Sequence, residues 1–146
     1  MSCCETTAST VSEGTCGSCG AKGLQVPVIT VKALLTADGL RAGIPQAPRF
    51  CASPDCPVVY FDDVTSRRVG ENELTVRVHA KHPSDESALV CYCFGHTAGT
   101  VIASRRAALV SSAVRIEVEA GHCACEVKNP KGTCCLGDLV RLERRE

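Results

Sequence analysis

The first half of the chain is built of short apolar runs separated by turn residues, a pattern typical of a small β-rich unit. A strand is predicted from the β-branched run LQVPVITVKALL at 24–35, and a short helical segment follows it near 36–43. Two strands joined by a turn at Pro54 are predicted from PRFCASPDCPVVYF at 48–61. A further strand is predicted from LTVRVHA at 74–80, where apolar and polar positions alternate.

The second half of the chain has helical spacing instead. The first predicted helix covers 98–110, with Thr97 as its N-cap candidate. A second helix covers 113–121 and ends at a glycine, which is a common helix stop. The last covers 136–146, where three leucines and a valine are spaced to form one buried face.

The change of pattern divides the chain into three parts, and the predicted fold class is α+β. Residues 1–14 are rich in serine, threonine and glutamate and predict a disordered tail. A β-rich module at 15–82 and a helical module at 88–146 follow, separated by a polar linker at about 81–88. Each module is too small to depend on a hydrophobic core alone, so we expect metals or cross-links to stabilise it.

Composition points to metals. The chain has 12 cysteines among 146 residues, and its start lacks the basic and apolar segments of a secretory signal. No run is long enough to span a membrane, so we expect a cytoplasmic protein whose cysteines bind metal rather than form disulfides. Positive and negative side chains balance at 16 each and aromatic residues are few, which disfavours nucleic acid as a partner. Motifs of hydrolases and nucleotide-binding enzymes are missing, so no enzymatic activity is expected.

The first cysteine set is a C-x-x-C knuckle followed by a pair on a predicted turn. It consists of Cys16, Cys19, Cys51 and Cys56. Four thiolates that leave no open position are typical of structural zinc, although a tetrahedral sulfur site also suits a single iron. The simpler alternative is four reduced cysteines buried in the core.

The second cysteine set lies in the helical half. It consists of Cys91, Cys93, Cys123, Cys125, Cys134 and Cys135. In an extended chain the two thiols of C-x-C face the same side, and a cluster of two irons needs four such ligands. Disulfides or a second zinc site are the alternatives that the spacing leaves open.

Together these motifs resemble a known family. CGSCG, RFCASPDCPVVYF, CYCFG and CACEVKNPKGTCCLGD are similar to the N-terminal domain of CopZ-type copper chaperones, a family of iron-sulfur cluster-binding metallochaperones. The resemblance covers residues 16–140. It implies a small zinc-binding β module followed by a helical module with a [2Fe-2S] cluster, the latter similar to bacterioferritin-associated ferredoxin.

The resemblance also implies a ligand set. That ferredoxin type has C-x-C and then a spacer of 31 residues, which is the number between Cys93 and Cys125. The implied cluster ligands are therefore Cys91, Cys93, Cys125 and Cys135, the last chosen over Cys134. The remaining thiols are candidate ligands for a soft ion such as Cu(I): Cys3, Cys4, Cys123 and Cys134.

The implied function is a metalloprotein of copper or other soft-metal homeostasis that keeps or delivers Cu(I), with a redox partner. Longer members of the family continue into a copper domain with a Met-x-Cys-x-x-Cys loop, which is missing here, so a separate copper-binding domain or a metal-transporting ATPase is the expected partner. The alternative is a ferredoxin-like one-electron carrier. The two metal sites are expected to be separate, so that losing the zinc site leaves the visible chromophore.

Overall fold

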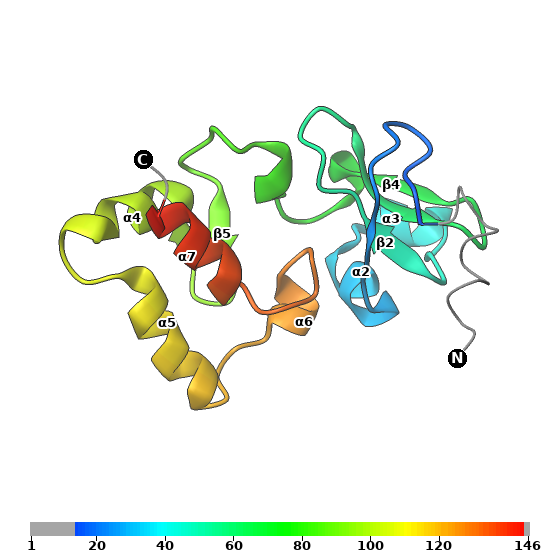
Figure 1. Ribbon diagram of the computed structural model, residues 1–146. Coiled ribbons are helices and arrows are strands. Elements are labelled where there is room, and N and C mark those ends of the chain that lie inside the picture. Colours follow the sequence, from blue (N-terminus) through cyan, green and yellow to red (C-terminus); the bar gives the residue numbers. More distant parts are fainter. Residues whose placement is uncertain (1–13, 145–146) are drawn as a thin grey trace, which may run out of the picture.

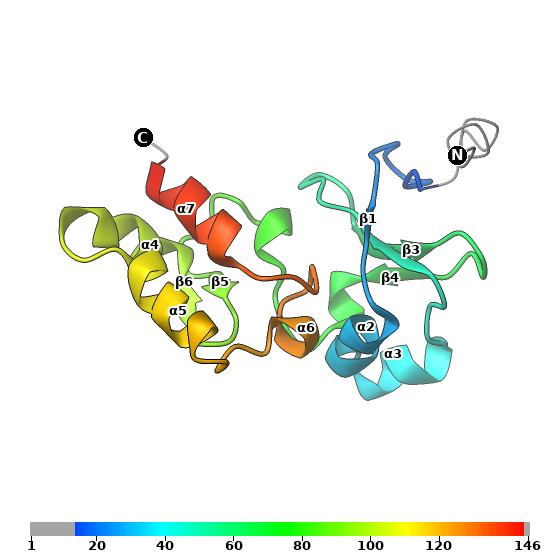
Figure 2. The same ribbon diagram turned by 60° about the horizontal axis from the view of Figure 1, so that its bottom comes forward.

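The computed structural model describes residues 14–144 and has helices and sheet in two halves that lie side by side (Figures 1 and 2). We call residues 14–82 the N-module and residues 88–144 the C-module. Cys3, Cys4 and nearly all of the predicted tail lie outside the described residues. Gly14, the last residue of that tail, is buried, and its amide donates to the Asp63 carboxylate at 2.9 Å.

An antiparallel sheet of four strands forms the centre of the N-module. Its order is β1 (Leu24–Gln25), β2 (Pro48–Phe50), β3 (Val58–Asp62) and β4 (Arg68–Gly70). The predicted strand–turn–strand at 48–61 is confirmed by β2 and β3, with Phe50 opposite Tyr60. Every residue of β3 is buried, including Asp62 after the apolar run at 58–61.

The run at 24–35 is mostly helical, and the predicted strand there is wrong. After the short β1, Pro27 leads directly into α2 (Val28–Leu34). Thr30, Val31 and Leu34 are its buried residues, a helical spacing that covers one side of the sheet core. Burial of this face outweighs the β propensity of the branched residues. The short helix near 36–43 is confirmed as α3 (Ala37–Ala42), whose first turn is capped by Thr36.

The predicted strand at 74–80 is also wrong. The region lies between two short 3-10 helices instead, η1 (Glu71–Glu73) and η2 (His79–Lys81), the second of which includes its last two residues. The backbone amides between them do not join the sheet: Thr75 donates to the carbonyl of Leu34, and Val78 donates to the Glu71 carboxylate. Leu74 and Val78 are still buried in the N-module core. Alternate side chains of an extended segment point to the same side, whether or not the segment joins a sheet.

The C-module is a small hairpin covered by helices. Its elements are β5 (Leu89–Cys91), β6 (His96–Thr97), α4 (Ala98–Ala103), η3 (Ser104–Arg106), α5 (Val110–Glu119), α6 (Cys125–Lys128) and α7 (Leu136–Arg144). The Thr97 hydroxyl accepts from the Thr100 amide and begins α4 as predicted. Gly121 has φ +80° just after α5, which confirms the predicted helix stop.

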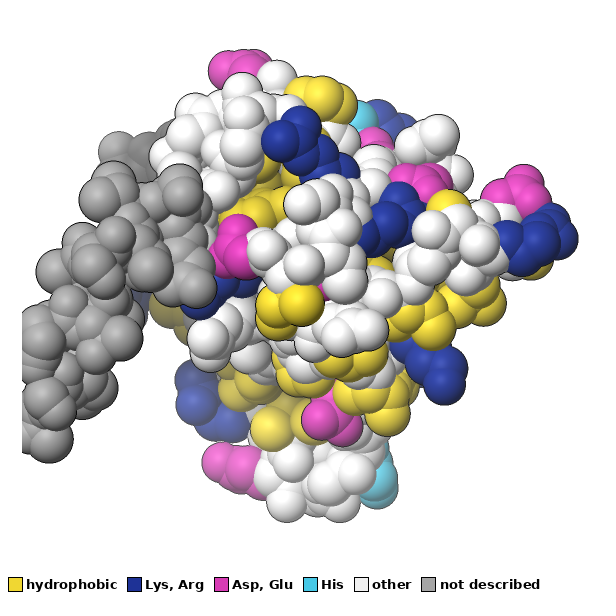
Figure 3. All heavy atoms as spheres, turned by 90° about the vertical axis from the view of Figure 1, so that its right-hand side faces the viewer, with side chains coloured by type: hydrophobic (Ala, Val, Ile, Leu, Met, Phe, Trp, Pro, Cys, Tyr) yellow, Lys and Arg dark blue, Asp and Glu magenta, His cyan; other side chains and the backbone are white. Residues whose placement is uncertain are grey.

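Each module has its own buried apolar cluster. The N-module cluster lies between the sheet and α2, and the C-module cluster lies among β5, α4, α5 and α7. A third and smaller cluster surrounds Cys16, Cys51 and Cys56. On the face shown in Figure 3, positive and negative side chains are interspersed with apolar ones. Within residues 14–144 no helix has the length and apolarity that crossing a membrane requires.

Candidate metal centres

The first cysteine set gathers at one end of the N-module sheet. Cys16 and Cys19 lie on a tight turn before β1, closed by hydrogen bonds from the Cys16 amide to the Ala21 carbonyl and from the Gly20 amide to the Cys16 carbonyl. Cys51 comes directly after β2, and Cys56 ends the turn that leads into β3. The strand pairing therefore delivers one pair of thiols, and the N-terminal turn delivers the other.

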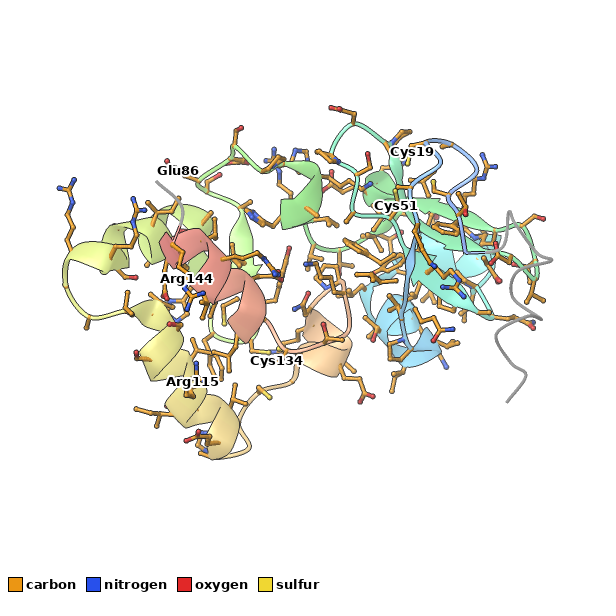
Figure 4. All side chains as sticks on the ribbon, in the orientation of Figure 1. Cys19, Cys51, Glu86, Arg115, Cys134 and Arg144 are labelled. Atoms are coloured by element: carbon orange, nitrogen blue, oxygen red, sulfur yellow. The ribbon has the colours of Figure 1, made fainter. Side chains whose placement is uncertain are left out.

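The four sulfur atoms are spaced as a tetrahedral metal requires. The Sγ atoms of Cys16 and Cys56 are 3.8 Å apart, those of Cys19 and Cys51 are 3.6 Å apart, and all four lie within 4.8 Å of one another. A zinc ion with Zn–S bonds of about 2.3 Å separates its sulfur ligands by about 3.8 Å. Figure 4 shows Cys19 and Cys51 at the same end of the module. The residues fit one tetrathiolate ion.

The four thiols differ in their surroundings. Cys16, Cys51 and Cys56 are buried, whereas Cys19 is exposed. A hydrogen bond with the Ala21 backbone lowers the pKa of Cys19 to about 7, and burial raises the pKa of Cys51 to about 12. Burial also raises the pKa of Cys56. A metal ion that binds here displaces the thiol protons, so the buried cysteines bind it as thiolates.

Lys81 is a residue of this site that sequence reasoning missed. Its side chain is buried, and its Nζ donates to the carbonyl of Ser53 at 2.8 Å, in the turn between Cys51 and Cys56. Its positive charge opposes the effect of burial on the pKa of Cys51. The lysine comes from η2, 25 residues after Cys56 in the sequence, and no local motif marks it.

The second cysteine set lies at the hairpin and the α6–α7 loop of the C-module. Cys91 ends β5, but Cys93 lies in the hairpin turn, so the expectation of an extended C-x-C is wrong. The chain turns back after Cys91 because β5 pairs with β6, with Cys91 opposite His96. Cys125 begins α6 and Cys135 directly precedes α7.

The four thiols implied by the resemblance are close together. The Sγ atoms of Cys93 and Cys125 are 3.4 Å apart. The neighbouring Cys135 thiol lowers the pKa of Cys91 to about 7 and that of Cys125 to about 6. Burial raises the pKa of Cys93 to about 11 although the Ala124 amide donates to its sulfur. Backbone amides that point at sulfur stabilise metal-bound thiolates.

The second set is less compact than the first. Of the described residues, the first set alone has three or more ligand atoms gathered tightly enough for one ion. Ligands of a two-iron cluster are divided between its irons, so a wider arrangement fits that group. Two-iron clusters are held by cysteine thiolates whose sulfur atoms accept hydrogen bonds, and the second set offers ligands of this kind.

The structure separates the two adjacent cysteines. Cys135 is buried among the other thiols, whereas Cys134 is exposed beside α6 (Figure 4). Cys123 is half-buried, and its thiol contributes to the lowered pKa of Cys125. The ligand assignment stays a prediction, and this geometry favours Cys135 over Cys134 in it.

The fold has a close counterpart among solved structures. The X-ray structure of the CopZ N-terminal domain from Archaeoglobus fulgidus matches with a TM-score of 0.71 and 32% identity, over 90% of this chain and 99% of that chain. The chain belongs to the CopZ N-terminal domain family. The α+β fold, with a mixed set of helices and strands, is therefore the family fold.

Comparison with longer proteins gives the extent of the match. The copper chaperone CopZ of Archaeoglobus fulgidus is 35% identical over 127 residues, which is 87% of this chain and 60% of CopZ. The chain thus spans less than two thirds of that relative's length. The CopZ-type family described as a zinc binding domain matches residues 13–75, a range that contains all of the first cysteine set and none of the second.

Proposed function

We propose that the protein is a cytoplasmic, non-enzymatic metalloprotein of copper homeostasis. It holds zinc in the first site and a [2Fe-2S] cluster in the second, and it keeps or delivers Cu(I). The main support is the tetrathiolate geometry of the first site within the range matched by the zinc binding family. The similarity to a protein named as a copper chaperone supports the link to copper.

Zinc in the first site has a structural role. Three of its four ligands are buried with Val58 and Phe61 in a cluster of their own, so the ion takes the place of a hydrophobic core at this end of the sheet. A closed tetrathiolate site contributes its binding energy to folding and leaves no position for chemistry.

The cluster, when bound, supplies a one-electron redox couple. Cys91, Cys93, Cys125 and Cys135 hold it, and the amide of Ala124 donates to one of its ligand sulfurs. Among the described residues, the half-buried Cys123 and the exposed Cys134 lie within two positions of these ligands in sequence and are the thiols available for a soft ion. The partners are a redox protein and a copper-binding domain or metal-transporting ATPase that receives Cu(I).

Anaerobic purification followed by a visible absorption spectrum tests the two metal assignments, with iron, zinc, copper and sulfide measured on the same sample. A red-brown protein with about two irons, two sulfides and one zinc per chain supports both. A colourless protein with two zincs per chain rules out the cluster and with it any electron transfer.

Competition with a Cu(I) chelator separates copper handling from simple electron transfer. The Cys123→Ser/Cys134→Ser and Cys3→Ser/Cys4→Ser double variants each remove one pair of spare thiols, and Thr133→Ser is a control next to Cys134 that removes no sulfur. A loss of Cu(I) affinity in either double variant identifies the pair that binds copper. Equal and weak binding in all four proteins favours the ferredoxin-like carrier.

A further inference from the structure

The two modules meet at the loop that carries half of the second site. Helix α6 packs against α2 of the N-module, and the two lie side by side in both ribbon views (Figures 1 and 2). Helix α6 begins with Cys125, and the chain then runs through residues 129–133 to Cys135. We call residues 125–135 the ligand loop. Whatever fixes this loop also fixes two of the four proposed cluster ligands.

Two buried hydroxyl groups of the N-module donate to the ligand loop. The Thr30 side chain, on α2, donates to the carbonyl of Glu126, and the Tyr60 side chain, on β3, donates to the carbonyl of Pro130. Thr30 and Tyr60 are both fully buried. Burial raises the pKa of Tyr60 well above its usual value, so its hydroxyl stays protonated and remains a donor. A buried carbonyl without a hydrogen-bond donor is costly, so each of these two hydroxyls stabilises the ligand loop.

The backbone at Gly132 fits tightly against the same surface. A Cβ atom at this position would lie 2.8 Å from the Thr30 hydroxyl and 2.9 Å from the Pro27 side chain. Gly132 also has φ +72°, a conformation that other residues adopt at a cost. The ligand loop therefore lies directly on the N-module with no space for a side chain between them.

The first site is connected to this contact through the sheet. Cys51 follows Phe50 in the chain, and its amide donates to the carbonyl of Val59, next to Tyr60. Phe50 is paired with Tyr60 across β2 and β3, and the two rings meet edge to face with centroids 5.9 Å apart. Tyr60 in turn donates to the ligand loop at Pro130. Packed side chains thus join a ligand of the first site to the loop of the second.

We propose that the N-module positions the second site, with Thr30 and Tyr60 as positioning residues, and that metal in the first site controls how firmly the ligand loop is held. Metal at Cys51 keeps the sheet folded, the sheet keeps Tyr60 in place, and Tyr60 holds the loop. The two sites are therefore coupled, in contrast to the separate sites expected from the sequence. The part of this inference that concerns the cluster rests on the proposed function.

The first experiment uses the full chain, anaerobic and loaded with zinc and cluster. Thr30→Val and Tyr60→Phe each remove one hydroxyl with little change of shape and leave a loop carbonyl without its donor. We expect both to keep zinc and to lose the cluster to an iron chelator on the order of tenfold faster, the factor that corresponds to about 1.4 kcal/mol.

Thr36→Val is the matched control. It is the same substitution in the same module, and it removes the hydroxyl that accepts from the Gly39 amide at the start of α3, far from the ligand loop in the sequence. We expect its cluster to be lost at the wild-type rate. Equal rates in wild type, Thr30→Val and Tyr60→Phe, or an equal increase in Thr36→Val, would overturn the positioning role.

The second experiment does not need the cluster. Hydrogen exchange is measured on cluster-free protein with zinc, and on Cys51→Ser, which cannot complete the first site. We expect loss of zinc to speed exchange of the ligand-loop amides of Val127, Asn129 and Gly132, which donate to the carbonyls of Ala124, Cys125 and Asn129. The amides of α5, which belong to the C-module core, serve as the internal reference and are expected to change far less.

The two experiments distinguish the two ideas. If the wild-type protein takes up no cluster but zinc still protects the ligand loop, the coupling stands and the cluster assignment falls. If the cluster forms and neither its loss rate nor the exchange of the loop responds to the variants, the cluster assignment stands and the coupling is wrong.

Discussion

Replacing Lys81 by methionine is expected to weaken zinc binding in the first site although Lys81 is not a ligand. Its ammonium group is buried and donates to the Ser53 carbonyl at 2.8 Å, inside the turn that carries Cys51 and Cys56. Zinc with four thiolates has a net charge of −2, so a buried cation beside it stabilises the loaded site. Methionine keeps a long unbranched side chain and removes the charge.

The magnitude follows from Coulomb's law. At an effective dielectric constant of about 20, opposite unit charges about 4 Å apart attract by about 4 kcal/mol, and twice that separation halves the energy. Lys81 contacts the turn rather than the sulfur atoms, and the charge of −2 is spread over four sulfur atoms, so we take the smaller value, about 2 kcal/mol, as a lower bound. This corresponds to a loss of at least about 30-fold in zinc affinity.

Zinc affinity is measured by competition with a chromophoric chelator under reducing conditions. Two controls separate charge from packing: Lys81→Arg keeps the positive charge at the site, and Lys32→Met removes a charge from an exposed position on α2. We expect both controls to bind zinc within about threefold of wild type, since exposed charges interact weakly with distant sites. Circular dichroism of the zinc-saturated proteins checks that each variant is folded.

A Lys81→Met protein that is folded and binds zinc as tightly as wild type would refute the reasoning. So would an equal loss in Lys81→Met and Lys81→Arg, because the effect would then come from side-chain shape. In either case the hydrogen bond to Ser53 would have a purely structural role.

Three further predictions concern single side chains. Cys135→Ser is expected to abolish the visible absorption and iron content that Cys134→Ser retains, because Cys135 is buried among the proposed ligands and Cys134 is exposed; the reverse result would exchange their roles. Cys51→Ser is expected to lose zinc and the folded structure of the N-module together, whereas Cys19→Ser keeps weakly bound zinc, since water can replace an exposed ligand; zinc analysis and circular dichroism check this, and equal loss in both would contradict it. Asp62→Asn is expected to cost about 2 kcal/mol at pH 7 in chemical unfolding. Burial disfavours its charge, but a hydroxyl and three backbone amides outweigh burial and lower the pKa of Asp62, so this contribution exists above the unfolded-state pKa and is lost as pH falls through the lower folded-state value. If the difference in unfolding free energy between wild type and Asp62→Asn stays constant below about pH 4, the lowered pKa of Asp62 is not its cause.

Local sequence patterns predicted those elements whose signals are short-range. The turn at Pro54, the N-cap at Thr97 and the stop at Gly121 depend on residues within one turn of each other, and all three are confirmed. The run at 28–34 was predicted wrongly because its β-branched residues favour a strand locally, while burial of one face against the sheet selects a helix. The strand predicted at 74–80 is wrong because backbone amides in this segment donate to α2 and η1 rather than to a neighbouring strand.

The candidate sites, too, could be predicted only where their signals are short-range. The first set could be assembled from sequence because C-x-x-C and a turn-flanked pair each bring two sulfurs together before any tertiary contact forms. The second set depended on a family resemblance, because six cysteines with irregular spacing allow several choices of four. Lys81, Thr30 and Tyr60 could not be found in this way: each acts on a residue at least 28 positions away.

The location of the cysteines also explains why coupling should run from the first site to the second. In the N-module the thiols form a small cluster at the end of the sheet, and Cys51 connects it to the main core because Phe50, its neighbour in the chain, packs there against Tyr60. In the C-module, Cys91, Cys125 and Cys135 belong to the main core itself. Filling or emptying the second site must therefore change the packing of its own module. Tyr60 holds the ligand loop against the N-module sheet, so we expect the loop to keep its shape only while that sheet is intact.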